Sequence, residues 1–217
     1  MKKVLIIIPK GFELLEASAF VDVFGWTRDV AKEDVATYFC GLDQEVAASF
    51  GTEEFPNIVK TDILIEDVIE NDYDSLALPG GFGRYGFFEN GFDDRILSLV
   101  RAFDDKKKPI GVVCTAALVL AKSGILANRR ATTYRRDNGM YVRQLDDMGA
   151  ICCDEDVVVS DNVITSSGPS TAPLVALGLV EMLFTKEVAA EVAYVMGYDE
   201  ALEAIEASGK KGMDRQR

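Results

Sequence analysis

The sequence predicts an α/β fold in which a mostly parallel sheet is covered by helices on both faces. Short aliphatic runs without charge, such as residues 4–8 and 110–113, are typical of strands buried on both sides. Between such runs, apolar residues recur at helical spacing, as they do in residues 13–30. Strand and helix alternate along most of the chain, which is the pattern of an open parallel sheet.

The expected strands are apolar runs that end near glycine, proline or aspartate. They are residues 4–8, 35–40, 46–50, 62–68, 75–78, 110–113, 131–133, 157–159 and 163–165. The run at 46–50 is interpreted as an arm of a small hairpin. The last two runs flank Asp161 and Asn162, which favours a direct pairing between them.

The expected helices are segments in which apolar side chains return every three or four residues. They are residues 13–30, 96–103, 115–122, 140–149, 172–184 and 189–194. Residues 82–92 are rich in glycine and aromatic side chains and are expected to form a loop. We expect one domain over residues 1–195 and a helical or disordered extension over residues 196–217, within which residues 200–207 have an amphipathic pattern.

Composition narrows the class of protein. The 217 residues carry 23 basic and 36 acidic side chains, a formal charge of −13, which argues against a nucleic-acid partner. No apolar run reaches 18 residues, so no membrane partner is expected. The first apolar run is short and ends at Pro9, so it is interpreted as a strand and not a signal peptide. A cytoplasmic location is the resulting expectation.

Cysteine and histidine usage restricts the chemistry. The four cysteines show no metal-ligand spacing, and neither a metal nor a cofactor is expected. Cys152 and Cys153 fall in a strand-like run, where neighbours point to opposite faces, so a disulfide between them is not expected. The sequence contains no histidine, which excludes Ser-His and Cys-His pairs within this chain.

Cys114 lies between a buried strand and a helix, at the place where a side chain projects from the carboxyl edge of the sheet. The first amides of the helix and its dipole favour negative charge there. We therefore expect a lowered pKa and a nucleophilic thiol. The alternative is a buried, inert cysteine, which is common for this residue type.

Five segments together carry a family resemblance. They are Lys10-Gly-Phe-Glu-Leu-Leu-Glu-Ala17, Ala77-Leu-Pro-Gly-Gly81, Gly111-Val-Val-Cys-Thr-Ala116, Ala131-Thr-Thr133 and Thr165-Ser-Ser-Gly-Pro-Ser-Thr171. In this order and spacing the chain resembles the ThiJ/PfpI family, from about residue 3 to residue 195. That family includes a deglycase and chaperone associated with Parkinson's disease, PfpI-type intracellular proteases and isonitrile hydratase. The resemblance implies a flavodoxin-like three-layer sandwich and a homodimer.

The resemblance also implies roles for individual residues. Cys114 matches the reactive cysteine, and Glu16 matches the acid whose carboxyl hydrogen-bonds the thiolate or its oxidised form. Gly80 and Gly81 match the loop that supplies a backbone amide to an oxyanion hole, with the Thr115 amide as the second donor. If Glu16 is buried beside Cys114, its pKa rises and it carries a proton at pH 7.

One departure from the family pattern concerns the partner of the cysteine. Thr132 and Thr133 are normally followed by histidine, but here Tyr134 follows them. A phenol is a poor base at neutral pH, so Tyr134 either donates a hydrogen bond or forms a wall of the pocket. Arg135 and Arg136 either bind an anionic substrate or are solvated loop charges.

These observations support two functional hypotheses. The first is a hydrolase or hydratase acting on a small carbonyl, amide or isonitrile-like substrate. In it Cys114 attacks, Glu16 transfers the proton, and the amides of Gly81 and Thr115 hold the oxyanion. The alternative is a redox sensor or chaperone-like stress protein in which Cys114 oxidises to a sulfinate. A DNA-binding regulator is disfavoured, because the acidic charge and the short tail leave little room for such a module.

Overall fold

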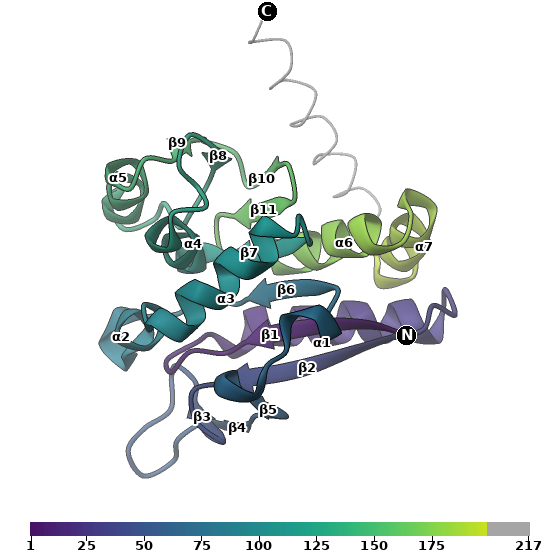
Figure 1. Cartoon of the computed structure of the whole chain (residues 1–217), viewed down its shortest axis with the longest axis horizontal. Helices are drawn as coiled ribbons and strands as arrows, with labels where there is room; N and C mark the ends of the chain where they lie inside the picture. Colours follow the sequence, from purple (N-terminus) through teal and green to yellow (C-terminus); the bar gives the residue numbers. More distant parts are fainter. Residues whose placement is uncertain (199–217) are drawn as a thin grey trace, which may run out of the picture.

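A computed structural model describes residues 1–198 and shows a seven-stranded sheet between helices (Figure 1). The strands of this sheet are β1 (Lys2–Ile7), β2 (Val35–Gly41), β5 (Ile63–Leu64), β6 (Ser75–Leu78), β7 (Ile110–Val113), β10 (Val157–Ser160) and β11 (Val163–Ser166). Their order is β10-β11-β7-β6-β1-β2-β5, and every pairing is parallel except that of β10 with β11. The expected mostly parallel sheet and the expected direct pairing of the strands that flank Asp161 and Asn162 are both confirmed.

Helices cover both faces of the sheet, as Figure 1 shows for α3 in front and α1 behind. The helices are α1 (Leu14–Asp29), α2 (Phe87–Gly91), α3 (Asp94–Asp105), α4 (Ala117–Ser123), α5 (Met140–Asp147), α6 (Ala172–Leu183) and α7 (Lys186–Met196). One layer consists of α1, α6 and α7, which contact one another, and in the other α4 packs against both α3 and α5. None of the helices within residues 1–198 is long and apolar enough to cross a membrane.

The structure differs from the sequence-based expectation in several short elements. Residues 82–92 do not form a plain loop, because they contain a 3₁₀ turn and α2. The expected strand at 62–68 is only β5 followed by a 3₁₀ turn. The hairpin arm β3 (Glu45–Ala47) pairs with an unexpected strand, β4 (Ile58–Lys60). The amphipathic segment 200–207 lies outside the described residues, and the domain boundary at 195 stays a prediction.

A small parallel sheet joins β8 (Arg130–Ala131) to β9 (Ile151–Cys152), beside the large one. The second of these strands contains Cys152, as expected, and all four cysteines are free thiols. Together these short strands anchor the segment that contains Tyr134, which follows β8 closely.

The centre of the sheet positions the site. Strands β6 and β7 are buried at every residue, and β1 is buried from Val4 to its end, because their side chains face helices on both sides. The three strands are neighbours and parallel, so the loops after Ile7, Leu78 and Val113 meet at one edge. The chain winds in opposite directions from β1, toward β2 on one side and toward β6 on the other. Such a switch point is where open α/β sheets bind ligands.

Candidate active site

Cys114 occupies a strained turn directly after β7. Its φ angle is +56°, a left-handed conformation that a residue with a side chain adopts at a cost of about 1–3 kcal/mol. The turn continues as a 3₁₀ helix over Cys114–Ala116 before α4 begins. The hydroxyl of Thr133, a fully buried residue, donates to the Cys114 carbonyl at 2.9 Å and helps to hold this conformation. The expected projecting turn at Cys114 is therefore present.

Glu16 lies in the first turn of α1 with 0% of its surface exposed. Its Oε2 accepts a hydrogen bond from the Gly80 amide at 2.5 Å, whereas Oε1 is buried and has no hydrogen-bond partner within the described chain. Burial, and secondly the charge of Glu13, raise the pKa of Glu16 to about 8, against the lowering effect of the Gly80 amide and the Cys114 thiol. Glu16 is therefore mostly a neutral acid at pH 7, in agreement with the expectation for a buried carboxyl.

The expectation of a lowered pKa for Cys114 is wrong. Only 5% of the residue is exposed, and burial is the largest cause that raises the pKa of its thiol well above the ordinary value, followed by the charge of Glu16. A hydrogen bond from the Thr115 amide lowers the pKa but does not compensate. The effect of Glu16 acts only where Glu16 is ionised, so the two groups titrate as a coupled pair. The amides at the start of the helix lower the pKa of the thiol by less than burial raises it.

Two backbone amides near the sulfur already have oxygen acceptors. The Gly80 amide donates to Glu16, and the Gly81 amide donates to Thr115 Oγ1 at 2.9 Å. The Thr115 hydroxyl in turn donates to the Gly81 carbonyl at 2.8 Å. The Gly80 and Gly81 amides, which the family resemblance assigns to an oxyanion hole, are thus engaged within the protein. The two hydrogen bonds between the Thr115 hydroxyl and the Gly81 backbone were not predicted from the sequence.

A cavity of about 780 Å³ opens beside Cys114. Its wall contains the predicted residues Gly81, Cys114, Thr115 and Tyr134. Further lining residues that the sequence did not single out as site residues include Glu13, Phe82, Tyr141, Asp156, Ser167 and Gly168. Glu16 lies behind this wall and does not line the cavity, so it reaches a substrate only through Cys114 or through a small conformational change.

Tyr141 is a residue that the sequence analysis missed. It lies in the first turn of α5, and its ring centroid is 6.5 Å from that of Tyr134. Burial, then the charges of Asp137 and Cys114, raise the pKa of Tyr141. A tyrosine within an expected helix carries no local signal of a site, because its position depends on how α5 packs against the rest of the fold.

The two arginines after Tyr134 have different surroundings. Arg135 forms ion pairs with Asp154 and Asp156, and the hydroxyl of Ser167 also donates to Asp156. Because both carboxylates pair with its guanidinium, the Arg135 side chain stabilises the cavity wall and is not available to bind an anionic substrate. Arg136 is exposed at the cavity and retains its positive charge toward solvent.

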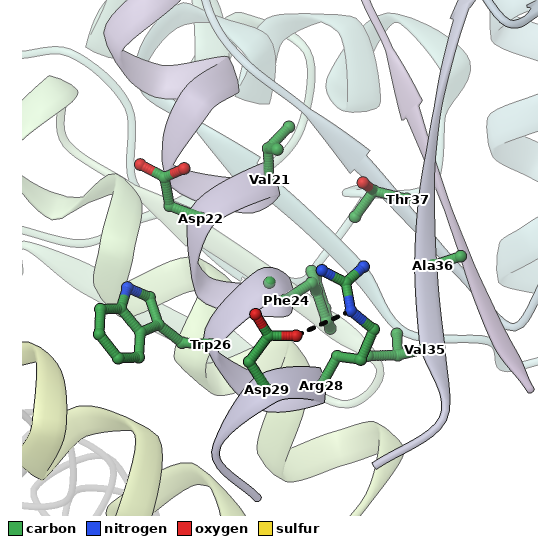
Figure 2. A pocket seen from close by; sticks show the side chains of 10 residues that line it. Val21, Asp22, Phe24, Trp26, Arg28, Asp29, Val35, Ala36 and Thr37 are labelled. Atoms are coloured by element: carbon green, nitrogen blue, oxygen red, sulfur yellow. Dashed lines mark hydrogen bonds and ion pairs between the residues drawn. The ribbon is translucent and has the colours of Figure 1, made fainter. Parts of the chain in front are cut away.

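A second cavity, of about 380 Å³, lies between α1 and β2 (Figure 2). Figure 2 shows Trp26 and the ion pair between Arg28 and Asp29 at its wall. No cysteine or buried carboxyl lines it, so the chemistry belongs to the cavity at Cys114. Within residues 1–198 no group of three or more Cys, Asp or Glu side chains is arranged to hold a metal ion.

Comparison with known proteins agrees with this geometry. A model of the DJ-1/PfpI family matches residues 2–182. Protein DJ-1 homolog B of Arabidopsis thaliana is 30% identical over 186 residues, which are 85% of this chain but only 39% of that protein, so this chain spans less than half its length. The glutathione-independent glyoxalase DJ-1 of Schizosaccharomyces pombe is 30% identical over 191 residues, covering 86% of this chain and 94% of the relative. The structure of oxidized Toxoplasma gondii DJ-1 superposes with a TM-score of 0.75 at 28% identity, covering 91% of this chain and 99% of the other.

Proposed function

Because the chain belongs to the DJ-1/PfpI family, we propose that it is a cysteine-dependent enzyme that acts on a small carbonyl, amide or isonitrile-like substrate. The observation that carries the proposal is the position of Cys114, on a strained turn at the wall of a cavity, with the neutral acid Glu16 behind it. A carbonyl substrate is supported by the name of the fission-yeast relative, which is a glyoxalase. The homodimer and the cytoplasmic location stay predictions.

The reaction begins with attack by the Cys114 sulfur on the electrophilic carbon. A sulfur–carbon bond forms, and the π electrons of the carbonyl or isonitrile move onto the substrate. The attacking species is the singly ionised Glu16–Cys114 pair, in which the thiol proton passes to the carboxylate. Its population grows as the pH rises toward about 8, the pKa of Glu16.

For an ester or amide, the adduct collapses with release of the alcohol or amine, which takes the proton from Glu16, and water then hydrolyses the thioester to the acid and regenerates the thiol. For an α-ketoaldehyde, a proton moves from the former aldehyde carbon to the neighbouring carbon to give a thioester, which water hydrolyses in the same way. For an isonitrile, Glu16 protonates the attacked carbon, and water releases the product as a formamide.

Cys114→Ser is expected to abolish turnover of whichever substrate is found. A panel containing methylglyoxal, p-nitrophenyl acetate, a primary amide and an isonitrile tests the substrate classes above. Loss of a nucleophile that works as a unit with its proton-transfer group costs at least about 10³-fold in kcat. Cys152→Ser, at a thiol outside the cavity, is the matched control and should retain full activity. Equal turnover by the wild type and Cys114→Ser contradicts the proposal, and so does a panel without any turnover.

A second candidate function, redox sensing, is favoured by the unpaired Oε1 of Glu16. A protonated carboxyl beside the sulfur can donate to an oxygen bound there, which stabilises a sulfinate. One thiol and two molecules of hydrogen peroxide give one sulfinic acid and two molecules of water. The relative of known structure from Toxoplasma gondii was determined in an oxidized form.

Titration with hydrogen peroxide tests this second candidate, with peptide mass spectrometry to locate the oxygen atoms. We expect two oxygens to accumulate on Cys114 before any of the other three thiols is modified. In Glu16→Ala, which lacks the donor, oxidation should continue to the sulfonic acid, because the sulfinate is no longer held. Uniform oxidation of all four cysteines, or preferential oxidation at Cys152 or Cys153, is the result that rejects redox sensing at Cys114.

A further inference from the structure

Water takes part in the last step of the proposed reaction, because the thioester on Cys114 is cleaved by hydrolysis. Neutral water is a weak nucleophile, and a base that removes its proton during the attack commonly accelerates such a step about 10²–10⁴-fold. The chain contains no histidine, so a carboxylate is the side chain that can accept this proton at neutral pH. Glu16 is fully covered and does not line the cavity, so a water molecule in the cavity does not reach its carboxyl.

Three carboxylates line the cavity within the described part of the chain, those of Glu13, Asp137 and Asp156. Asp156 is ion-paired with Arg135. Asp137 accepts a hydrogen bond from the Tyr141 amide through Oδ2 at 3.0 Å, and its Oδ1 is buried. One of these acids is therefore paired and another is bonded at one oxygen and covered at the other, which leaves Glu13.

The Glu13 carboxylate is unpartnered although 92% of the residue is buried, since only 8% of its surface is exposed. Glu13 directly precedes α1, where a side chain often caps the helix, yet it makes no such bond. Among residues 1–198 its carboxylate has no hydrogen-bond or ion-pair partner. Neither of its oxygens is fully covered, unlike Oε1 of Glu16, so the carboxylate reaches the cavity that it lines. A carboxylate buried without a partner costs free energy, which a role in catalysis explains.

The backbone holds Glu13 beside the turn that carries the sulfur. The Glu13 amide donates to the Gly80 carbonyl at 2.8 Å, and the Gly80 amide donates to Glu16. Gly80 itself lies against the cysteine, because a β-carbon at position 80 would be only 2.9 Å from Cys114 Cβ. The backbone of Gly80 is thus the one layer between the start of α1 and Cys114, and Glu13 enters the cavity from that start.

The two acids at the start of α1 differ in their protonation. Burial raises the pKa of Glu13, but Glu16 is covered completely, and the charge of Glu13 helps to raise the pKa of Glu16 to about 8. Glu13 therefore ionises first, while Glu16 holds its proton at pH 7. Carboxyl pairs whose surroundings separate their pKa values in this way commonly divide the roles of base and acid.

We propose that the Glu13 carboxylate is the general base that activates water for hydrolysis of the Cys114 thioester. This inference rests on the proposed function and assigns a catalytic residue within it. The water oxygen bonds to the acyl carbon, the water proton passes to Glu13, and the carbonyl π pair moves onto the carbonyl oxygen. When that pair returns, the carbon–sulfur bond breaks, and the sulfur keeps its electron pair and takes the proton from Glu13. The carboxylic acid leaves, and the thiol and the Glu13 carboxylate are restored.

Acetylation by p-nitrophenyl acetate separates the formation of the thioester from its hydrolysis. Release of p-nitrophenolate in the first turnover measures the formation. After rapid removal of the reagent, mass spectrometry of the intact protein and of the Cys114 peptide follows the loss of the acetyl group. Glu13→Gln, which keeps the size of the side chain, should be acetylated within a few-fold of the wild-type rate but deacetylated about 100-fold more slowly.

Three further measurements separate a missing base from a damaged cavity. Hydroxylamine cleaves a thioester without a general base, and it should deacetylate Glu13→Gln as fast as the wild type. Asp137→Asn changes the other carboxylate that has no ion pair, and it should deacetylate within a few-fold of the wild type. Glu13→Ala is a second, independent variant, in which sodium formate should accelerate deacetylation and sodium chloride at the same concentration should not.

The possible failures distinguish the inference from the function on which it rests. If Glu13→Gln loses its acetyl group at the wild-type rate, the assignment of Glu13 is overturned and the cysteine enzyme stands. The assignment is also overturned if Asp137→Asn slows deacetylation as much, or if acetylation or hydroxylamine cleavage of Glu13→Gln falls in parallel with its deacetylation. If Cys114→Ser turns over the ester like the wild type, the function and the inference fail together.

Discussion

Replacing Glu16 by glutamine is expected to stabilise the protein progressively as the pH rises from 4.5 to 8. The pKa of Glu16 is about 8 in the folded chain and about 4.5 when solvated, so the folded state holds a proton that the unfolded state has lost. The free energy of unfolding of the wild type therefore falls by about 1.4 kcal/mol per pH unit in this window, roughly 5 kcal/mol in all. The glutamine amide carries no ionisable proton, so the free energy of unfolding of the variant does not fall with pH for this reason.

Urea unfolding of both proteins at several pH values measures the effect. The difference in unfolding free energy between the Glu16→Gln variant and the wild type should grow with pH and level off above about pH 8. Glu181→Gln, at an exposed residue of α6, provides the control and should leave the pH slope unchanged. A pH-independent difference between Glu16→Gln and the wild type means that Glu16 ionises normally in the folded protein, and the acid role assigned to it then fails.

The sequence predicts best those elements whose own residues suffice to define them. Strands β6 and β7 match the expected runs residue for residue, because each is a short, uncharged and mostly apolar segment with a proline at one end. Helix α2 was missed because it is only five residues long and one of them is a glycine. It exists because Phe87 is fully buried and the ring of Phe88 packs against those of Phe92 and Tyr141. Such contacts between distant segments are invisible to local periodicity.

Some features of the site are likewise predictable from local motifs, whereas others depend on contacts between distant segments. The motifs identify Cys114 and Glu16, and the pKa of Glu16 follows from its burial as expected. The thiol pKa does not follow from the local helix start, because it depends on how deeply the sulfur is covered and on two acids in α1 and the loop before it. The engagement of the Gly81 amide by Thr115 and the position of Tyr141 in the wall of the same cavity likewise depend on contacts between segments that are distant in the sequence.

Gly81→Ala is expected to lower the free energy of unfolding by about 3 kcal/mol, the upper part of the range for overpacked sites. A β-carbon at position 81 would lie 2.3 Å from the Gly11 carbonyl oxygen and 2.4 Å from the Phe87 ring. Gly11 itself has a φ of +75°, and Phe87 is fully buried, so neither neighbour can retreat cheaply. The displaced loop would also weaken both hydrogen bonds between Gly81 and Thr115.

The same chemical change at Gly25 should have the opposite sign. Gly25 lies inside α1, and a β-carbon there would meet no atom within 4 Å, because the second cavity lies beside it. Alanine loses less conformational freedom than glycine in a helix, so Gly25→Ala should gain about 0.5–1 kcal/mol. Urea unfolding of both variants therefore gives a comparison in which the added methyl group is constant and only its surroundings differ. If the Gly81→Ala protein is as stable as the wild type, the loop beside Cys114 moves at little cost in free energy. That result would contradict the interpretation that hydrogen bonds from the Gly80 and Gly81 amides to Glu16 and Thr115 hold the loop in place.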